Sequence, residues 1–208
     1  MAQTRQVRAI RTREVLLRAA AEVFDEAGYA GASINRILER AGLTAGAVYF
    51  HFKSKEGLAR AVILEQAVDL RFPQGRTDLQ QLLDMTGYLA VEMQHNTLLR
   101  AGVRLAVEQE VAGLEEYAIY EWWAERFREE LLVARDGGEL LPGVDEAAFA
   151  QLLVAAYTGT QIMSQVSTNR ADLPARIAGM WRCLLPALAP GHVIAHLRLP
   201  QPTGQDSA

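Results

Sequence analysis

The chain has 208 residues, half of them hydrophobic, and a formal net charge of −4. This length suits one compact unit or two small, interlocked domains. No apolar run approaches the roughly 18 residues of a membrane-spanning helix, and no apolar stretch follows the basic start, as a secretory signal would require. These features argue against a membrane protein and a secreted protein, and they predict a cytoplasmic one.

The charge is divided unevenly along the chain. Residues 1–60 contain ten Lys or Arg and six Asp or Glu, a net of +4, and residues 61–208 contain eleven and nineteen, a net of −8. A positive segment attracts DNA phosphates, whereas an acidic remainder is repelled by them. The division favours nucleic-acid binding through the first 60 residues.

Helical spacing of apolar residues predicts a first helix from about residue 7 to residue 27, ended by Gly28. Ser33 can cap a short second helix, and Gly42 is placed to end it in the left-handed conformation. Thr44 can cap a third helix after a turn of about three residues. Two short helices joined by a tight turn form a helix-turn-helix, which places its second helix in the major groove of DNA.

The third helix has side chains suited to that role. Ala45 and Gly46 at its start are small, so the helix can approach DNA closely. Tyr49 offers a hydroxyl group and a ring, and His51 offers a ring nitrogen for a phosphate oxygen. These four residues are therefore candidate DNA contacts.

Phe50 and Phe52 are expected to face the protein core and to anchor this helix. Lys55 follows Ser54 at the start of the next helix, where the helix dipole disfavours a cation. A DNA phosphate bound at that N-terminus would satisfy both the lysine and the free N–H groups. The alternative is a simple corner between helices, in which Lys53 and Lys55 are only solvated.

The run AGLTAGAVYFHFKSKEGL resembles the DNA-binding signature of TetR-type transcriptional repressors. The matching positions are Gly42, Leu43, Thr44, Gly46, Tyr49, His51, Phe52, Lys55 and Leu58, together with Ala20, Phe24, Gly28 and Tyr29 upstream. Ala45 departs from the pattern, because many relatives carry Lys or Arg there. The resemblance implies a repressor that binds double-stranded operator DNA as a homodimer, through Thr44, Ala45, Gly46, Tyr49, His51, Lys53 and Lys55.

Further helices are predicted over residues 55–72, 78–93, 97–111, a long stretch around Trp122 and Trp123, 145–166 and 173–188. No stretch alternates with the period of a strand, so the predicted fold is all-α. We expect a helix-turn-helix domain over residues 1–55, an effector-binding and dimerisation domain over residues 56–198, and a flexible tail over residues 199–208.

The last two of these helices are apolar on most sides, and such helices must be covered on several sides. Either they are central to one subunit or a second copy covers them. The TetR resemblance implies the second case, a homodimer formed through the last two long helices. Cys183, the single cysteine, lies in this apolar pattern and is expected to be a buried small side chain.

Several short runs resemble a subset of TetR-type repressors, the γ-butyrolactone-type autoregulator receptors that control secondary metabolism in actinobacteria. The runs are AVYFHF, LLRAGVRLA from Leu98, EWW from Glu121 and AYTGTQ from Ala156. In that subset a tryptophan packs on the effector, and a threonine and a glutamine bind its polar groups. The matching residues here are Trp123, with the adjacent Trp122 as the alternative, Thr158 and Gln66.

A small lactone or furan needs an apolar slot with a few hydrogen-bond partners. The slot is expected to be formed by the tryptophan together with Tyr88, Leu89 and Val107, and the partners are expected to be Thr158 and Gln66.

Other functions have weaker support. The chain has four histidines and no G-x-S-x-G, phosphate-binding or dinucleotide-binding motif, so we expect neither an enzyme nor a metal or cofactor site. A DNA-binding protein without an effector is one alternative. A TetR-type repressor that senses an antibiotic, a biosynthetic intermediate or another xenobiotic is the second.

Overall fold

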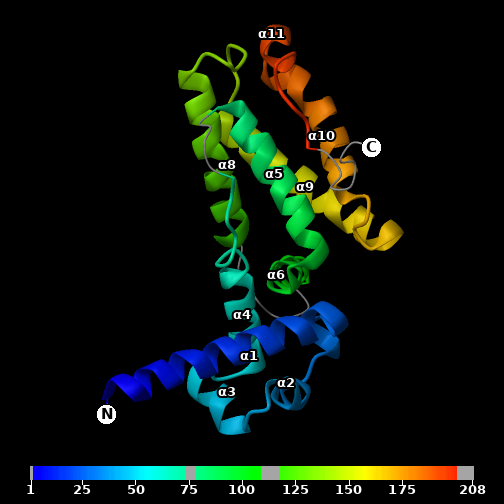
Figure 1. Cartoon of the computed structure of the whole chain (residues 1–208). Coiled ribbons are helices and arrows are strands. Elements are labelled where there is room, and N and C mark those ends of the chain that lie inside the picture. Colours follow the sequence, from blue (N-terminus) through cyan, green and yellow to red (C-terminus); the bar gives the residue numbers. More distant parts are fainter. Residues whose placement is uncertain (1, 74–77, 109–117, 201–208) are drawn as a thin grey trace, which may run out of the picture. The chain divides into compact units, whose positions relative to one another are not determined.

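The computed structural model describes residues 2–73, 78–108 and 118–200, with side chains from Gln6 onward (Figure 1). Over these residues it contains ten α-helices and no β-strand, which confirms the all-α prediction. The described residues form two compact units. Unit 1 extends to Leu70 and includes Asn96–Ile119, and unit 2 comprises Arg71–His95 and the residues from Tyr120 onward.

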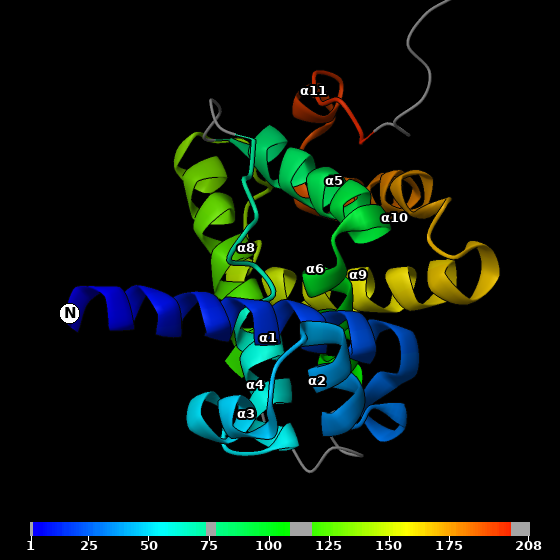
Figure 2. The same cartoon turned by 60° about the horizontal axis from the view of Figure 1, so that its bottom comes forward.

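In its described part, unit 1 contains α1 (Ala2–Gly31), α2 (Ile34–Ala41), α3 (Ala45–His51), α4 (Lys55–Glu65) and α6 (Thr97–Val107). Two views show α2 and α3 on one side of α1 and α6 on the other (Figures 1 and 2). Helices α4 and α6 pack against each other as well as against α1. The domain boundary expected after residue 55 therefore falls inside this unit, and the predicted domains stay a prediction.

Local capping signals in the sequence explain where the short helices begin and end. The hydroxyl of Ser33 accepts a hydrogen bond from the N–H of Arg36 at 3.2 Å, and Gly42 ends α2 with φ of 63°. Asn96 caps α6 by accepting from the N–H of Leu99 at 3.1 Å. Thr44 precedes α3 as predicted, although its side chain makes no capping hydrogen bond.

The core of unit 1 consists of apolar residues that repeat at helical spacing. Among those with no exposed surface are Leu16, Ala20 and Phe24 of α1, Ile37 of α2, Val48 of α3, and Leu58 and Val62 of α4. Each large side chain buried in this way contributes roughly 1.5–3 kcal/mol to folding. Helices α2 and α3 of the helix-turn-helix thus pack on α1, which also packs against α4.

The helix predicted over residues 55–72 is wrong in its length, because α4 ends at Glu65 and residues 66–69 form turns. The side-chain amide of Gln66 donates to the backbone oxygen of Ile63 at 2.8 Å, a carbonyl that a continuing helix would bond through residue 67. The chain then leaves the helical path, and Val68, which follows the end of α4, is 57% exposed.

The described helices of unit 2 are α5 (Leu79–His95), α8 (Ala118–Asp136, with its first two residues in unit 1), α9 (Glu146–Thr168), α10 (Leu173–Leu188) and α11 (Gly191–Ile194). Helix α10 lies beside α5 and also packs on α9 (Figure 2). Trp181 of α10 is fully buried and donates its indole N–H to the hydroxyl of Thr86 at 2.8 Å.

The prediction that Cys183 is buried is wrong, since this cysteine is exposed. Trp181, which is buried, lies two residues earlier, and two residues correspond to about 200° around a helix. Cys183 therefore lies on the opposite face of α10. Because α10 is apolar on both faces, the sequence did not reveal which face packs inward.

Candidate DNA-binding and effector-binding residues

The first residues of α3 form a small exposed surface. Thr44, Ala45 and Gly46 are exposed, Tyr49 is 62% exposed, and no atom lies within 4 Å of a Cβ placed at Gly46. Val48 on the other face of the helix is completely buried. One apolar side chain thus anchors α3 and leaves its small residues open to a partner.

The prediction that both Phe50 and Phe52 face the core is wrong for Phe50. Phe52 is 7% exposed and packs beneath the guanidinium of Arg13 at 5.2 Å, whereas Phe50 is 78% exposed. Phe50 lies two residues after the buried Val48, on the far side of the helix. Its ring lies edge-on to His51 at 4.8 Å. An exposed aromatic ring beside Tyr49 is a candidate for apolar contact with a thymine methyl group, which the sequence reasoning missed.

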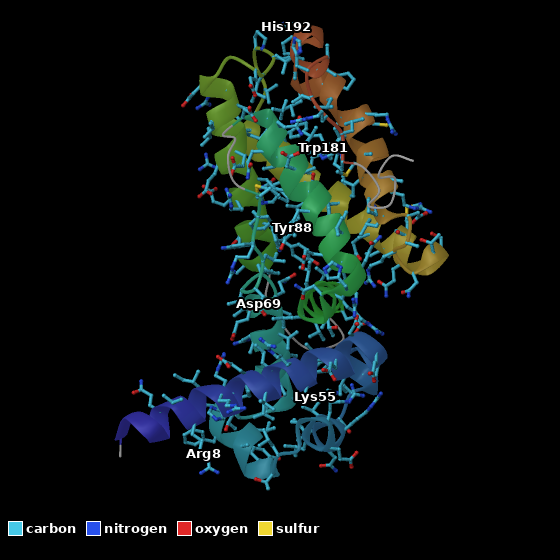
Figure 3. The ribbon with its side chains drawn as sticks, viewed as in Figure 1. Arg8, Lys55, Asp69, Tyr88, Trp181 and His192 are labelled. Atoms are coloured by element: carbon cyan, nitrogen blue, oxygen red, sulfur yellow. The ribbon has the colours of Figure 1, made fainter. Side chains whose placement is uncertain are left out.

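Lys55 lies at the N-terminus of α4, where the hydroxyl of Ser54 caps the helix by accepting from the N–H of Gly57 at 3.1 Å (Figure 3). The ammonium nitrogen of Lys55 lies 4.2 Å above the ring of Tyr29, a cation–π contact. The hydroxyl of Tyr29 donates to Glu56 at 2.9 Å, and burial together with this carboxylate raises the pKa of Tyr29 to about 12. The lysine is therefore supported from beneath at a helix N-terminus.

Some of the other cations of unit 1 form ion pairs within the protein, and others are exposed to solvent. Arg36 and Arg40 of α2 pair with Glu26, and Arg40 also pairs with Glu22. Lys53 is exposed and has φ of 69°, which turns the backbone between α3 and α4. Arg8 is exposed on the N-terminal part of α1 and extends toward the side that carries α3 (Figure 3).

Two predicted effector-binding residues lie in unit 1. Gln66 is 1% exposed, and its amide oxygen has no hydrogen-bond partner among the described residues, although its amide nitrogen is bonded to Ile63. Val107, near the end of α6, is 46% exposed. Gln66 thus has one buried polar atom available to a ligand, since an unpaired buried acceptor is costly.

The aromatic residues predicted to bind the effector lie in unit 2. Phe72 lies edge-on to Tyr88 at 5.7 Å and to Trp123 at 6.3 Å, and Trp123 also contacts Phe127 at 5.9 Å. The hydroxyl of Tyr88 accepts from the N–H of Arg71 at 3.0 Å (Figure 3). Leu89, on the same helix as Tyr88, is only 4% exposed, and Trp122 is 46% exposed. The aromatic group therefore includes Trp123 and Tyr88 and leaves much of Trp122 in solvent.

Helix α9 carries polar groups on its inner side. The hydroxyl of Tyr157 and the amide oxygen of Gln161 are buried without a partner in the described part of the chain, and burial raises the pKa of Tyr157. Thr158, the predicted hydrogen-bond partner, is half-buried. Thr86 and Thr168 bond back to their own helices, and no such bond is found for Thr158 within the described ranges. The sequence reasoning missed Tyr157 and Gln161, whose only signal was their polarity in an apolar helix.

The described residues contain no group of three or more His, Cys, Asp or Glu that could hold a metal ion. In none of the described stretches is a helix both long and apolar enough to cross a bilayer.

Comparison with known families identifies the chain. Residues 16–62 match the family of bacterial regulatory proteins called tetR, and residues 76–190 match a tetracyclin repressor-like C-terminal domain. The chain belongs to the TetR family. Membership of this family of regulatory proteins confirms that this TetR-family chain is not an enzyme.

Individual proteins of known name or structure are also similar to the chain. The TetR-family chain is 39% identical to the A-factor receptor protein of Streptomyces griseus, over 93% of this chain and 70% of that protein. A γ-butyrolactone receptor described as ArpA-like is similar at 32% identity and a TM-score of 0.69, over 89% of this chain and 92% of that one. CprB of Streptomyces coelicolor, in complex with its biological operator sequence, is similar at 30% identity and a TM-score of 0.71, over 91% and 95% of the two chains.

Proposed function

We propose that this protein is a cytoplasmic repressor that binds a pseudopalindromic operator as a homodimer and is released by a small signalling molecule. The effector class is a γ-butyrolactone, butenolide or furan, and the regulated genes belong to secondary metabolism. The observation that carries the proposal is the exposed, small-residue start of α3 beside Lys55, in a chain related over most of its length to the A-factor receptor.

The proposed DNA contacts are Thr44, Ala45, Gly46, Tyr49, His51, Lys53 and Lys55, with Phe50 added because of its exposure. The small residues allow α3 to enter the major groove, and Tyr49 and Phe50 then reach base edges. Lys55 binds a phosphate together with the free N–H groups at the start of α4. Such phosphate contacts fix the register of the protein on the duplex.

Lys55→Ala is expected to weaken binding to an operator duplex uniformly across related sequences, while the fold stays intact. Because one phosphate contact is lost, the slope of log affinity against log salt should become shallower by about 1. Titrations at several salt concentrations, with an operator selected from random duplex DNA, measure this slope. Arg128→Ala is the matched control, since it removes a half-exposed cation of α8 that pairs with Glu125. A slope equal to that of the parent would contradict the role of Lys55.

The proposed dimer interface lies on the exposed faces of α9 and α10. Leu152, Met163 and Val166 of α9 are 50%, 63% and 84% exposed, and Gly159 on the same face is also exposed. An apolar stripe of this length is unusual on a monomer and typical of a surface covered by a partner. A second copy of the chain is the partner we propose, because an operator with two half-sites requires twofold symmetry.

Met163→Glu is expected to convert the dimer to a monomer and to weaken operator binding at least tenfold, because a carboxylate would be buried against its own copy across the axis. Sedimentation velocity measures the assembly state. Val133→Glu is the matched control: Val133 of α8 is 39% exposed, and the same change there should leave the dimer intact. A Met163→Glu protein that remains dimeric would show that the interface lies elsewhere.

We further propose that the effector binds Gln66, Tyr88, Leu89, Val107, Thr158 and a tryptophan. The contacts of Trp123 with Phe72 and Phe127 support Trp123 over the more exposed Trp122. Within unit 2 the half-buried hydroxyl of Thr158 supports a polar contact with the effector, and within unit 1 the unpaired amide oxygen of Gln66 supports another. A neutral ligand with a few hydrogen-bonding atoms on an apolar frame suits this composition.

A further inference from the structure

The end of α6 is bonded to the end of α1 within unit 1. The carboxylate of Glu108, the C-cap of α6, accepts from the backbone N–H of Tyr29 at 2.8 Å. Its other oxygen accepts from the guanidinium of Arg104 at 2.8 Å, and Arg104 also donates to the backbone oxygen of Asp25 at 2.6 Å. Two charged side chains at the end of α6 therefore bond to backbone groups on either side of the kink at Gly28, the oxygen of Asp25 and the N–H of Tyr29.

Gly28 makes this close approach possible. Its φ of 68° and ψ of −177° lie in a region that is essentially restricted to glycine. A Cβ at this position would lie 2.7 Å from a guanidinium nitrogen of Arg104 and 2.8 Å from a carboxylate oxygen of Glu108. The backbone turn at Gly28 thus aims the N–H of Tyr29 at Glu108.

The same tyrosine supports the start of α4. Its ring lies beneath the ammonium group of Lys55 at 4.2 Å, and its hydroxyl donates to Glu56 at 2.9 Å. A continuous series of contacts therefore leads from Glu108 through Tyr29 to Lys55. Every member of the series belongs to unit 1, so none depends on how the two units are placed.

Helix α6 is also joined directly to unit 2. Only Asn96, its N-cap, separates it from α5, which ends at His95 in unit 2. An ion pair between Arg100 and Asp25 at 2.7 Å also connects α6 to α1. A single residue of the chain therefore separates α5 of unit 2 from the helix that carries Arg104 and ends at Glu108.

We propose that Arg104 and Glu108 are positioning residues for operator binding, which hold Tyr29 and thereby Lys55 in the DNA-binding position and transmit the effector signal to them. This inference rests on the proposed function, because it assumes that Lys55 contacts operator DNA. Both side chains bond to the end of α1 and act through Tyr29.

The test compares Glu108→Ala with Lys55→Ala and with the double variant. Glu108→Ala should weaken operator binding about tenfold and reduce the salt slope by about 1, as the loss of the Lys55 phosphate contact does. The effects should be non-additive in the double variant, because both act on one contact. Glu108→Gln keeps an acceptor for Tyr29 and should restore part of the affinity. Glu125→Ala, which breaks another ion pair within one helix, is the matched control.

An unchanged affinity in Glu108→Ala, or a loss that is additive with Lys55→Ala and leaves the salt slope intact, would overturn the proposal. A measurement that needs no DNA is the rate of amide hydrogen exchange of residues 27–31 and 53–57 in the free protein. Exchange should be faster in Glu108→Ala, and equal rates would overturn the proposal even if the variant is less stable overall. Failure of the proposed function has a different signature, a parent protein that binds no selected duplex.

Transmission of the effector signal is tested with A-factor, the molecule after which the receptor of Streptomyces griseus is named, as the probe. The ratio of operator affinities without and with saturating A-factor should shrink toward one in Glu108→Ala, while affinity for A-factor alone stays as in the parent. A ratio equal to that of the parent would overturn transmission through these residues.

Discussion

Trp123→Ala is expected to give a repressor that stays on its operator when the effector is added. The substitution removes a large apolar surface that contacts Phe72 and Phe127. Truncation of a buried aromatic at a binding site costs about 2–4 kcal/mol, which corresponds to roughly 30-fold to 1,000-fold in effector affinity. Operator affinity should be unchanged, because α3 and Lys55 belong to unit 1.

Operator release as a function of A-factor concentration measures this effect. Trp122→Ala is the matched control, because Trp122 is the same residue type, adjacent in sequence and 46% exposed. Thr158→Val keeps the side-chain shape and removes one hydrogen bond, so it should cost only about 1 kcal/mol. A normal response in Trp123→Ala with a failed response in Trp122→Ala would assign the site to Trp122, and normal responses in both would place the effector elsewhere.

Gly57→Ala is expected to destabilise the junction between α3 and α4 by about 3 kcal/mol, as overpacking against backbone does. A Cβ at Gly57 would overlap the backbone oxygen of Phe52, which is also bonded to the N–H of Ser54 at 2.8 Å. The end of α3 would have to move, so operator binding should fall as well. Thermal or denaturant unfolding measures the loss of stability.

Gly46→Ala is the control for this prediction, because it is the same substitution in the neighbouring helix. No atom lies within 4 Å of a Cβ at Gly46, and alanine is a better helix former by about 0.5–1 kcal/mol. The stability of this variant should therefore equal or exceed that of the parent. Equal stabilities of Gly57→Ala and the parent would show that the junction adapts without cost.

The helix-turn-helix could be predicted because its signals are local. The hydroxyl of Ser33 and the left-handed Gly42 act within three residues of the helix ends they define. The all-α fold followed equally from helical periodicity over the whole chain. By contrast, α4 ends early because Gln66 donates to Ile63. This helix end depends on the hydrogen bond of a single side chain, which the periodicity of apolar residues does not reveal.

Burial was harder to predict where apolar residues cover both sides of a helix. Phe50 and Phe52 differ in the sequence only by their position relative to Val48, yet one is exposed and the other buried. The prediction that Cys183 is buried was wrong for the same reason. The contact between Glu108 and Tyr29 joins residues 79 positions apart, so no pattern along the chain indicated it.

Effector and operator are expected to compete through one conformational equilibrium. An effector releases DNA only if it binds the DNA-incompetent state more tightly than the DNA-bound state. By linkage, the operator must then weaken effector binding by the same factor by which the effector weakens operator binding. Both factors can be measured with the same protein, A-factor and one selected operator duplex.

The most direct test is therefore to measure the affinity of the protein for A-factor by titration with and without saturating operator. Fluorescence anisotropy of a labelled duplex reports the release of the operator in the first of these titrations. We predict that A-factor releases the duplex. The affinity of the protein for A-factor should be lower in the presence of the operator, by the same factor by which A-factor lowers the affinity for the operator. Equal A-factor affinities in the two titrations, with the duplex still bound at saturating A-factor, would contradict the account.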